Sequence, residues 1–412
     1  ASRRVQRRDR TVRFIVEELK QEFEMSLSRK TAVAGVFEHP TRFAPDKSLF
    51  QIMAESVRGA LDDAGLTIKD VNGVCTTGIG MSGMGIIGFC DYLNLTPNFV
   101  DSTSIGGSSF VAHTAHAAAA IHAGLCDVCI VVYGSTAASS RFAIGTGGGG
   151  GGGGGDPCDQ YEIPFGPTTV GSYAMIAQRH MHDYGTTSEQ LAEIAVTMRL
   201  HASMNPVAKY RDPITVEDVL ASRIISSPLH LLDCCIISDG GGALVITSAE
   251  RARDLKKKPV YILGTGETVR HAARGQRDFL EIAAAQSGRL AFERAGVAHK
   301  DIDMAMIYDS FTITVLSTLE NLGFCKRGEG GAFVSGGRLR FDGEFPINTD
   351  GGGLSSNHPG MRGIFLVIEA TKQLRDECGP RQVKDCKIAL AHGTGGTLGT
   401  RHSGATLILS NQ

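Results

Sequence analysis

The segment that decides the fold occurs twice in the chain. It reads Ala60-Leu-Asp-Asp-Ala-Gly-Leu-Thr-Ile-Lys-Asp-Val71 in the first half and Ala291-Phe-Glu-Arg-Ala-Gly-Val-Ala-His-Lys-Asp-Ile302 in the second. In both copies an amphipathic pattern precedes the segment and stops at its glycine, which is typical of a helix C-terminus. An apolar run, 73–77 or 304–308, follows each copy and predicts a strand. The repeated helix–strand unit indicates an internally duplicated α/β fold.

A second correspondence extends the duplication. Val100-Asp-Ser-Thr-Ser-Ile-Gly-Gly-Ser-Ser109 precedes an alanine-rich predicted helix and a predicted strand over 127–133. Ile347-Asn-Thr-Asp-Gly-Gly-Gly-Leu-Ser-Ser356 precedes a predicted helix near 364–374 and a strand over 386–390. Both copies therefore follow the order strand, glycine turn, buried helix, strand, which is typical of a βαβ unit with parallel pairing. We predict two pseudo-symmetric, βαβ-rich halves.

We place the N-terminal half at residues 25–255 and the C-terminal half at 256–412. The first half is longer because residues about 135–230 interrupt it with loops and a predicted helix near 188–204. We expect this insertion to form a lid or a layer that faces the substrate. The chain then returns through three glycines to a strand over 239–247.

Two stretches carry no fold signal. Residues 1–24 hold six arginines in their first 13 positions and precede Met25. We expect an extension that does not belong to the natural protein, and the alternative, a targeting presequence, is disfavoured by its four glutamates. Residues 147–155 are nine consecutive glycines, a composition typical of a flexible loop that buries nothing.

Composition narrows the functional classes. The chain has 412 residues, with 41 Lys and Arg against 43 Asp and Glu, so it has no general basic surface for a nucleic acid. No apolar run reaches the roughly 18–20 residues of a membrane helix. The 10 cysteines include no CxxC pair, which favours a reducing cytoplasm over secretion. The 52 glycines cluster after apolar runs, as in enzymes with many close backbone approaches.

A strand, a glycine turn and a helix N-terminus together present free backbone N–H groups to an anion. Dinucleotide binding, phosphate binding and oxyanion stabilisation in acyl transfer all use this arrangement. No GxGxxG follows the first predicted strand and no GxxxxGK[ST] is present, which disfavours the two nucleotide chemistries. Oxyanion or acyl-group binding remains, with a purely structural role in helix–strand packing as the alternative.

Several motifs resemble a known family. Three of them follow one another in the order of the thiolase superfamily: Ser238-Asp-Gly-Gly-Gly-Ala243, Asn357-His-Pro-Gly360 and His392-Gly-Thr-Gly-Gly396. Tyr308-Asp-Ser-Phe311, followed by Leu319-Glu-Asn-Leu-Gly-Phe-Cys325, is similar to the sterol-carrier-protein and lipid-transfer-protein branch. The resemblance covers about residues 30–412 and implies the thiolase fold, with layers in the order α/β/α/β/α, and activity on acyl-CoA thioesters.

The sequence departs from this family at its nucleophile. The resemblance places the family's nucleophilic cysteine at Gly107, and residues 91–125 contain no cysteine. The second thiol of the branch falls at Ser310. We therefore do not expect a cysteine acyl-enzyme. Ser108 or Ser109 as a substitute nucleophile remains an alternative, although an unactivated hydroxyl is a poor one.

The electrostatic part of the site is retained. His358 matches the family histidine that polarises the thioester carbonyl so that an enolate develops, and Tyr308 stands at the position of its partner. The phenol of Tyr308 can donate to the same oxygen or exchange a proton. His392 is a third candidate catalytic residue. The alternatives are a turn histidine for His358, a core tyrosine for Tyr308 and a structural role for His392.

The resemblance also implies a second oxyanion hole formed by backbone N–H groups. The residues expected there are Gly107, Ser108, Ser109, Gly393 and Gly395. We expect no permanently bound cofactor, and the histidines show no metal-ligand spacing. A coenzyme A thioester is the expected substrate.

Loss of the nucleophile together with a retained carbonyl-activating site suggests aldol or retro-aldol chemistry through a CoA enolate. The lipid-transfer-protein-like aldolases of steroid degradation resemble this chain, because they lack the cysteine and have tyrosine at the position of Tyr308. The resemblance implies a small zinc-ribbon/OB-fold partner that binds acyl-CoA. His358 replaces a second tyrosine of those enzymes, which leaves a steroid substrate open. The alternative functions are an acyltransferase with another nucleophile and a non-catalytic acyl-CoA or lipid-binding scaffold.

We also expect a homodimer. The predicted strand near Val100–Ser104 is apolar, uncharged over most of its length and lies at a sheet edge in this interpretation. Edges of this kind leave unpaired backbone groups, and a second copy of the chain commonly covers them.

Overall fold

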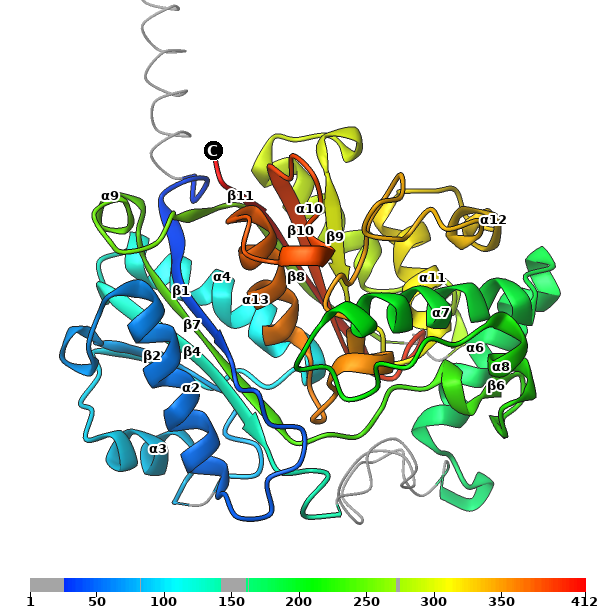
Figure 1. Cartoon of the computed structure of the whole chain (residues 1–412), viewed down its shortest axis with the longest axis horizontal. Helices are drawn as coiled ribbons and strands as arrows, with labels where there is room; N and C mark the ends of the chain where they lie inside the picture. Colours follow the sequence, from blue (N-terminus) through cyan, green and yellow to red (C-terminus); the bar gives the residue numbers. More distant parts are fainter. Residues whose placement is uncertain (1–25, 82, 142–160, 162, 272–274) are drawn as a thin grey trace, which may run out of the picture.

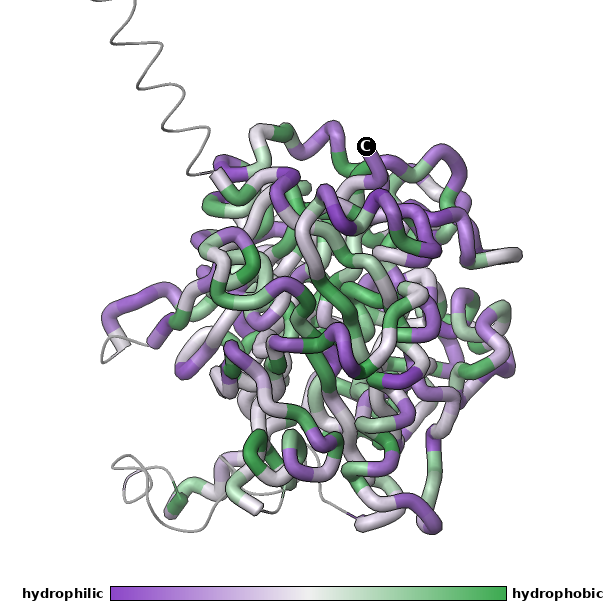
Figure 2. Tube along the Cα trace, turned by 90° about the vertical axis from the view of Figure 1, so that its left-hand side faces the viewer, coloured by the Kyte–Doolittle hydropathy of each residue, from purple (hydrophilic) through white to green (hydrophobic). Residues whose placement is uncertain are grey.

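The computed structural model describes residues 26–81, 83–141, 161, 163–271 and 275–412 (Figure 1). The predictions about residues 1–24 and about the glycine run 147–155 fall outside these residues. Within the described part of the chain, no helix is long and apolar enough to cross a membrane. Figure 2 shows hydrophobic positions concentrated in the interior of the chain trace, with hydrophilic positions mostly at its periphery.

A mixed sheet forms the centre of the fold. In the described residues its strands follow the order β3-β2-β4-β7-β1-β8-β11-β10-β9. The strands are β1 Thr31–Glu38, β2 Gly73–Cys75, β3 Phe99–Asp101, β4 Val128–Ser135, β7 Gly240–Ser248, β8 Val260–Arg270, β9 Met304–Ile307, β10 Ile388–Gly396 and β11 His402–Ser410. A separate hairpin pairs β5 (Ile224–Ser226) with β6 (Leu229–His230).

The strand order confirms the predicted duplication. Reading outward from the β1–β8 junction, β1-β7-β4-β2-β3 in one direction corresponds to β8-β11-β10-β9 in the other. An isolated parallel bridge between Ala305 and Ile347 stands where β3 stands in the first half. The predicted parallel pairs are present, β2 with β4 and β9 with β10, whereas the pairs that involve β1, β7, β8 and β11 are antiparallel. The domain boundary at residues 255/256 remains a proposal.

Helices cover and separate the two groups of strands. They are α2 Leu49–Ala64, α3 Ile86–Leu93, α4 Ser109–His122, α6 Thr169–Tyr184, α7 Ser188–Met204, α8 Val216–Ala221, α9 Ala249–Arg253, α10 Ala284–Ala295, α11 Thr312–Leu322, α12 Gly330–Val334 and α13 Gly363–Leu374. Figure 1 shows α4 and α13 beside each other between the strands of the two halves. Apolar side chains of α4 and α13 pack in one core with strands of both halves. The layered α/β/α/β/α architecture is thus confirmed.

The repeated segment explains why α2 and α10 pack in the same way. Each helix ends at a glycine in the left-handed region, Gly65 with φ 75° and Gly296 with φ 66°, a conformation that costs other residues steric strain. A Cβ atom at Gly35 of β1 would overlap the carbonyl oxygen of Ala60, and one at Gly264 of β8 would overlap that of Ala291. Glycine therefore allows each outer helix to lie directly on its strand.

The insertion of the first half packs on the second half. Residues of α6 and α7, including Tyr173 and Ile194, share an apolar core with α11. A Cβ atom at Gly351 would lie 2.5 Å from the Cβ of Ala202 in α7, so this helix also supports the second glycine turn. The predicted helix near 188–204 is confirmed as α7. A lid role for the insertion remains a prediction.

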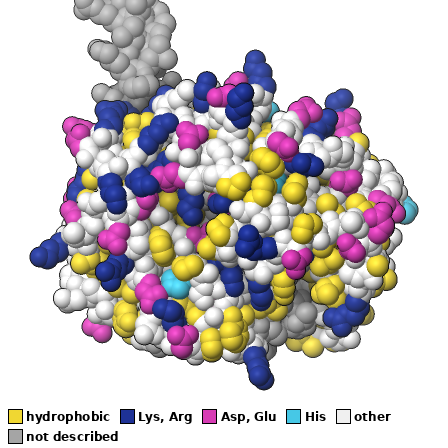
Figure 3. Space-filling model, in the orientation of Figure 1, with side chains coloured by type: hydrophobic (Ala, Val, Ile, Leu, Met, Phe, Trp, Pro, Cys, Tyr) yellow, Lys and Arg dark blue, Asp and Glu magenta, His cyan; other side chains and the backbone are white. Residues whose placement is uncertain are grey.

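Several predicted strand bounds are wrong. The strand expected over 73–77 ends at Cys75, and the one expected near Val100–Ser104 ends at Asp101. The strand expected over 386–390 is β10, which begins at Ile388 and continues to Gly396 because it pairs along its whole length with β11. Gly393 and Gly395 therefore lie inside a strand, not in a turn after it. Figure 3 shows charged side chains of both signs interspersed over one face, as expected from the balanced composition.

Candidate active site

Tyr308 and His358 form a buried hydrogen-bonded pair. The phenol oxygen of Tyr308 lies 2.9 Å from Nε2 of His358, and the two rings are nearly perpendicular, with an interplanar angle of 89°. Only 4% of Tyr308 and 3% of His358 is exposed. The structure therefore brings together two candidate catalytic residues that are 50 positions apart in the sequence.

Backbone hydrogen bonds fix both residues. Tyr308 directly follows β9, and its N–H donates to the carbonyl of His392 in β10 (2.9 Å). His358 N–H donates to the hydroxyl of Ser238 (3.0 Å), and Ser238 N–H donates to the carbonyl of His358 (3.3 Å). Tyr308 is thus held by β10, and His358 by the segment just before β7.

Burial determines the protonation of the pair. Desolvation raises the pKa of the Tyr308 phenol well above its usual value, whereas burial and the nearby charge of Arg362 lower the pKa of His358 to about 3. At neutral pH the phenol is protonated and the imidazole is neutral, so the pair holds two protons and makes one hydrogen bond. Nδ1 of His358 has no partner among the described residues. Whichever imidazole tautomer is present, one donor of the pair is not used in the hydrogen bond between the two side chains.

Gly107 lies directly against the ring of Tyr308. It belongs to the turn Gly106–Ser108 that precedes α4. A Cβ atom at position 107 would overlap Cε2 of Tyr308, and it would lie 2.6 Å from Cζ of the same ring and 2.5 Å from the carbonyl oxygen of Thr394. The tyrosine ring therefore fills the space into which any side chain at position 107 would extend, including that of a cysteine.

The hydroxyls of Ser108 and Ser109 form hydrogen bonds within their own turn and, for Ser108, with Ser403 of β11. Ser108 donates to the carbonyl of Ile105 (2.8 Å) and lies 2.7 Å from the hydroxyl of Ser403. Ser109 donates to the carbonyl of Gly106 (2.7 Å) and accepts from the N–H of Ile105 (2.9 Å). None of these partners is a base that would activate a nucleophile.

The two predicted glycine segments meet in space. A Cβ atom at Gly393 would lie 2.8 Å from Cα of Ser108, and one at Gly395 would overlap the carbonyl oxygen of Ile105. Close approach of β10 to the start of α4 is therefore possible only with glycine at these positions. The first N–H groups of a helix lack intrahelical partners, so this region can offer donors to an oxyanion. The role of the five predicted residues as donors remains a prediction.

The side chain of His392 is not brought to the pair. Its Nδ1 lies 2.9 Å from the hydroxyl of Thr406, which lies 3.0 Å from the hydroxyl of Ser287 in α10. The neighbouring Gly393 faces α4, and successive residues of a strand face opposite sides. His392 therefore contributes its carbonyl to the positioning of Tyr308, while its imidazole faces the α10 layer. A catalytic role for His392 remains an untested prediction.

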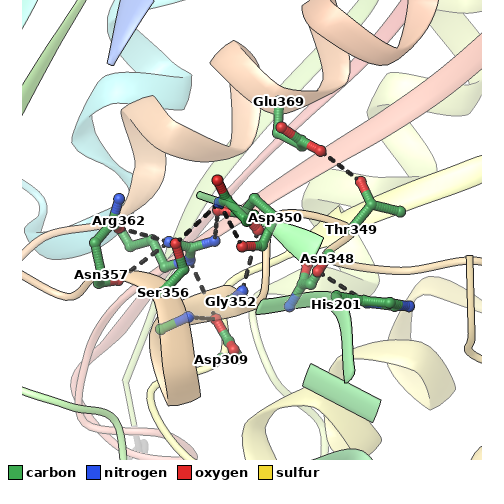
Figure 4. Close-up of polar contacts among 12 residues, drawn as sticks. His201, Asp309, Asn348, Thr349, Asp350, Gly352, Ser356, Asn357, Arg362 and Glu369 are labelled. Carbon is green, nitrogen blue, oxygen red and sulfur yellow. Dashed lines mark hydrogen bonds and ion pairs between the residues drawn. The ribbon is translucent and has the colours of Figure 1, made fainter. Parts of the chain in front are cut away.

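Sequence reasoning missed the charged residues beneath the pair. Arg362 is fully buried and bonds Asp309, Asp350 and Asn357 (Figure 4). The sequence signal that could have identified Arg362 was a single charge in the apolar run Met361-Arg-Gly-Ile-Phe-Leu366, because an isolated charge inside a buried segment requires a partner.

Cys235, whose thiol pKa is raised by burial, donates its backbone N–H to the carbonyl of Ser310 (2.9 Å).

Comparison with known proteins identifies the family to which the chain belongs. The thiolase C-terminal domain-like family matches residues 266–411. The chain is 34% identical over 386 residues to an acetyl-CoA acetyltransferase of Methanothermobacter thermautotrophicus, covering 90% of this chain and 98% of the relative. It is 35% identical over 377 residues to a steroid side-chain-cleaving aldolase of Thermomonospora curvata, covering 88% of this chain and 95% of that protein.

A solved structure agrees along almost the whole chain. The structure described as an Ltp2-ChsH2(DUF35) aldolase superposes with a TM-score of 0.84 at 34% identity, covering 93% of this chain and 98% of that one. Coverage of 93% spans both halves, and the family match at residues 266–411 includes Tyr308 and His358. The chain is therefore an enzyme that belongs to the thiolase superfamily, in its branch of sterol-carrier-protein and lipid-transfer-protein-like members.

Proposed function

We propose that this enzyme cleaves or forms a carbon–carbon bond in acyl-CoA thioesters by aldol chemistry, through a CoA enolate and without a cysteine acyl-enzyme. The observation that carries the proposal is the Tyr308–His358 pair, whose tyrosine ring packs on Gly107. This arrangement provides a proton-transferring pair and leaves no room for a side chain at the position of the family nucleophile.

In the cleavage direction the substrate is a β-hydroxyacyl-CoA. The Tyr308 oxygen accepts the proton of the β-hydroxyl group while its own proton passes to Nε2 of His358, 2.9 Å away. The electron pair of the broken O–H bond forms the carbonyl of the leaving ketone or aldehyde. The Cα–Cβ bond breaks, and its electron pair is held on the thioester as an enolate. Return of the proton from His358 through Tyr308 to Cα completes the acyl-CoA product and restores the enzyme.

The enolate oxygen needs donors that are in place before the reaction. The turn Gly106–Ser108 lies against Tyr308 and begins a helix, so its free N–H groups are suited to this oxygen. A thioester carbonyl placed there would have its Cα and Cβ atoms next to the phenol of Tyr308.

The names of two similar proteins support this proposal. One is described as a steroid side-chain-cleaving aldolase and the other as an aldolase complex. The similar acetyl-CoA acetyltransferase keeps acyl transfer as a second candidate, with Ser108 or Ser109 as nucleophile, and a non-catalytic acyl-CoA-binding scaffold as a third.

The test is a direct assay for both reactions. The purified enzyme, alone and with a co-expressed zinc-ribbon/OB-fold partner, is incubated with β-hydroxyacyl-CoAs that carry a tertiary hydroxyl group. We expect release of a ketone and a shortened acyl-CoA, and no covalent adduct with radiolabelled acyl-CoA. Thiolysis without cleavage, together with a labelled serine, would replace the proposal by the acyltransferase. Tight binding without either reaction would favour the scaffold.

We further propose a homodimer that works with such a partner protein. The edge strand β3 has its Val100 53% exposed, so an unpaired apolar strand faces outward. The similar aldolase structure contains a second protein, ChsH2(DUF35). Light scattering should give about twice the chain's 43.7 kDa mass, and a monodisperse monomer at micromolar concentration would contradict the dimer.

A cytoplasmic location is part of this proposal. All cysteines within the described residues are free thiols, and Cys75 and Cys129 lie with their sulfurs 3.6 Å apart without a disulfide. Free neighbouring thiols are typical of a reducing compartment.

A further inference from the structure

We propose that Arg362 is a positioning residue for the Tyr308–His358 pair, because its guanidinium ties the residue after Tyr308 to the residue before His358. The inference rests on the proposed function, in which this pair transfers the proton. Arg362 itself does not touch the pair in the described contacts, so it would act through Asp309 and Asn357.

The guanidinium binds both neighbours of the pair. Nε of Arg362 lies 3.2 Å from Oδ1 of Asp309 in an ion pair that lacks hydrogen-bond geometry. One terminal nitrogen donates to the backbone carbonyl (3.1 Å) and the side-chain oxygen (2.6 Å) of Asn357. The other terminal nitrogen pairs with the carboxylate of Asp350. Figure 4 shows Arg362 between Asn357 on one side and Asp350 on the other, with Asp309 below.

The partners of Arg362 are themselves held from a second side. The carboxylate of Asp309 accepts from the N–H groups of Gly353 (2.7 Å) and Leu354 (3.2 Å). The side-chain nitrogen of Asn357 donates to Glu38 of β1, which also pairs with Arg42. A rotation of Asp309 or Asn357 would break several bonds at once, so the backbone on either side of the pair has little freedom.

A fully buried guanidinium fork fits this role better than a point charge would. Arg362 is 0% exposed and is among the largest fully buried side chains. It presents donors in fixed planar directions: its two terminal nitrogens hydrogen-bond Asp350 on one side and Asn357 on the other, while Nε forms an ion pair with Asp309. A lysine at this position could satisfy the charge but not all three partners.

Arg362 also sets the electrostatic surroundings of the pair. Burial is the main cause of the lowered pKa of His358, and the positive charge of Arg362 lowers it further. For Tyr308, whose pKa burial raises, this charge acts in the opposite direction. The other titratable groups that act on the pair are Cys235, Tyr133 and Tyr173, which raise the pKa of Tyr308. Asp309 and Asp350 face Arg362 itself, and burial raises the pKa of Asp309 to about 6.

The test compares two buried arginines near opposite ends of one helix. Arg362→Met and Arg362→Lys are measured beside Arg375→Met and Arg375→Lys. Arg375 is the residue that ends α13, is 7% exposed, pairs with Asp63, and donates to the carbonyls of Ala34 and Lys258. It shares none of the Arg362 partners in these contacts, so it controls for the loss of any buried guanidinium.

We expect Arg362→Met to lower kcat of carbon–carbon cleavage by about 10²-fold with KM changed less than about threefold, since a displacement of about 1 Å has such an effect. Loss of the positive charge should also raise the pKa of His358 and move the acidic limb of the pH–kcat profile upward. Arg362→Lys should restore the pH limb but only part of kcat. The Arg375 variants should lower Tm while kcat stays within about threefold.

Three outcomes would overturn the inference. Equal losses of kcat in the Arg362 and Arg375 methionine variants would show a general structural role. An unchanged pH limb in Arg362→Met, or a change in KM alone, would also contradict positioning. If Arg362→Met does not fold, Arg362→Lys and Arg375→Lys are compared instead, and equal losses of kcat in these two variants would contradict the inference. Full activity of Tyr308→Phe would instead refute the proposed function, which separates the two failures.

Discussion

The two halves contain equivalent glycine turns that have become different. The first turn, Gly106–Ser108, is closed by serine hydroxyls and passes directly into α4. The second, Gly352–Ser356, is a π-helical turn separated from α13 by the segment that contains His358. The N–H groups of Gly353 and Leu354 in the second turn are taken by the carboxylate of Asp309.

The difference between the two turns indicates that the two halves of the duplicated fold have different roles at the site. Each turn presents backbone N–H groups as an anion site, but in the second half an anion of the protein itself, Asp309, occupies that site. The second turn thereby becomes a support for Tyr308 and His358. The first turn has no such carboxylate in the described contacts, which supports the proposal that it faces a substrate oxygen.

The largest loss of activity is expected when the Tyr308–His358 pair, which the second turn supports, is broken. Tyr308→Phe should lower kcat by about 10²–10⁴-fold because proton transfer is lost, with little change in KM. The change leaves Nε2 of the buried His358 without its partner, so the free energy of unfolding should fall by about 1–3 kcal/mol. Steady-state kinetics and urea unfolding measure both.

Tyr173→Phe is the matched control for Tyr308→Phe. Tyr173 is also buried, and its hydroxyl donates to the carbonyl of Gly396 (3.0 Å). We expect a similar loss of stability with kcat within about tenfold. Comparable kcat losses in both variants would show that a buried phenol, and not the pair, determines activity.

The next largest loss of activity is expected from a substitution in the first turn. Gly107→Ala places a Cβ atom into the ring of Tyr308 and 2.5 Å from the carbonyl oxygen of Thr394. Overpacking of this kind costs about 1–3 kcal/mol, and the displaced phenol should reduce kcat about as much as its removal. Gly124→Ala at the other end of α4 is the control, since its Cβ atom meets nothing within 4 Å although its φ is +72°. It should destabilise by about 1–2 kcal/mol and leave kcat unchanged.

A smaller effect is expected from the serines of the first turn. Ser108→Ala and Ser109→Ala each remove a buried hydroxyl that bonds only within or beside the turn. Stability should fall by about 1–2 kcal/mol while kcat stays within a few-fold. An inactive serine variant combined with a normal Tyr308→Phe would establish a serine nucleophile and reverse the comparison of the two turns.

The last prediction concerns the pH dependence of stability and not kcat. Burial lowers the pKa of His358 to about 3, so below its ordinary value of about 6.5 the unfolded chain binds a proton that the folded chain does not. This histidine therefore makes the protein less stable as the pH falls from about 6.5 towards 3, by at most about 1.4 kcal/mol per pH unit. His358→Gln should reduce the slope of unfolding free energy against pH in this window.

The control for the pH experiment is His122→Gln, which replaces an exposed histidine at the end of α4. We expect the slope to change more in His358→Gln than in this control. Asp309, whose pKa is raised to about 6 by burial, contributes in the opposite direction between about 3.8 and 6, since its folded form holds the proton. An unchanged slope in His358→Gln would mean that this imidazole is not held neutral by its surroundings.

Local sequence patterns were sufficient for much of the architecture. The helix that ends at Gly65 and its copy that ends at Gly296 were predictable because a glycine after an amphipathic run is a local signal. Tyr308 and His358 were predictable as a pair from the resemblance of their motifs. The length of β10 was not, because its glycines lie in a strand only through pairing with β11.

By itself the sequence determined the duplication, the order of helices and strands within the repeated units and the absence of a cysteine at position 107, since these depend on residue identity and short-range pattern. Only the tertiary structure decided that the ring of Tyr308 covers Gly107, that the imidazole of His392 faces α10, and that Arg362 joins Asp309 to Asn357. These contacts join residues that are up to about 200 positions apart, and they depend on which strands pair and which face each side chain takes. Such information resides in packing and not in local sequence.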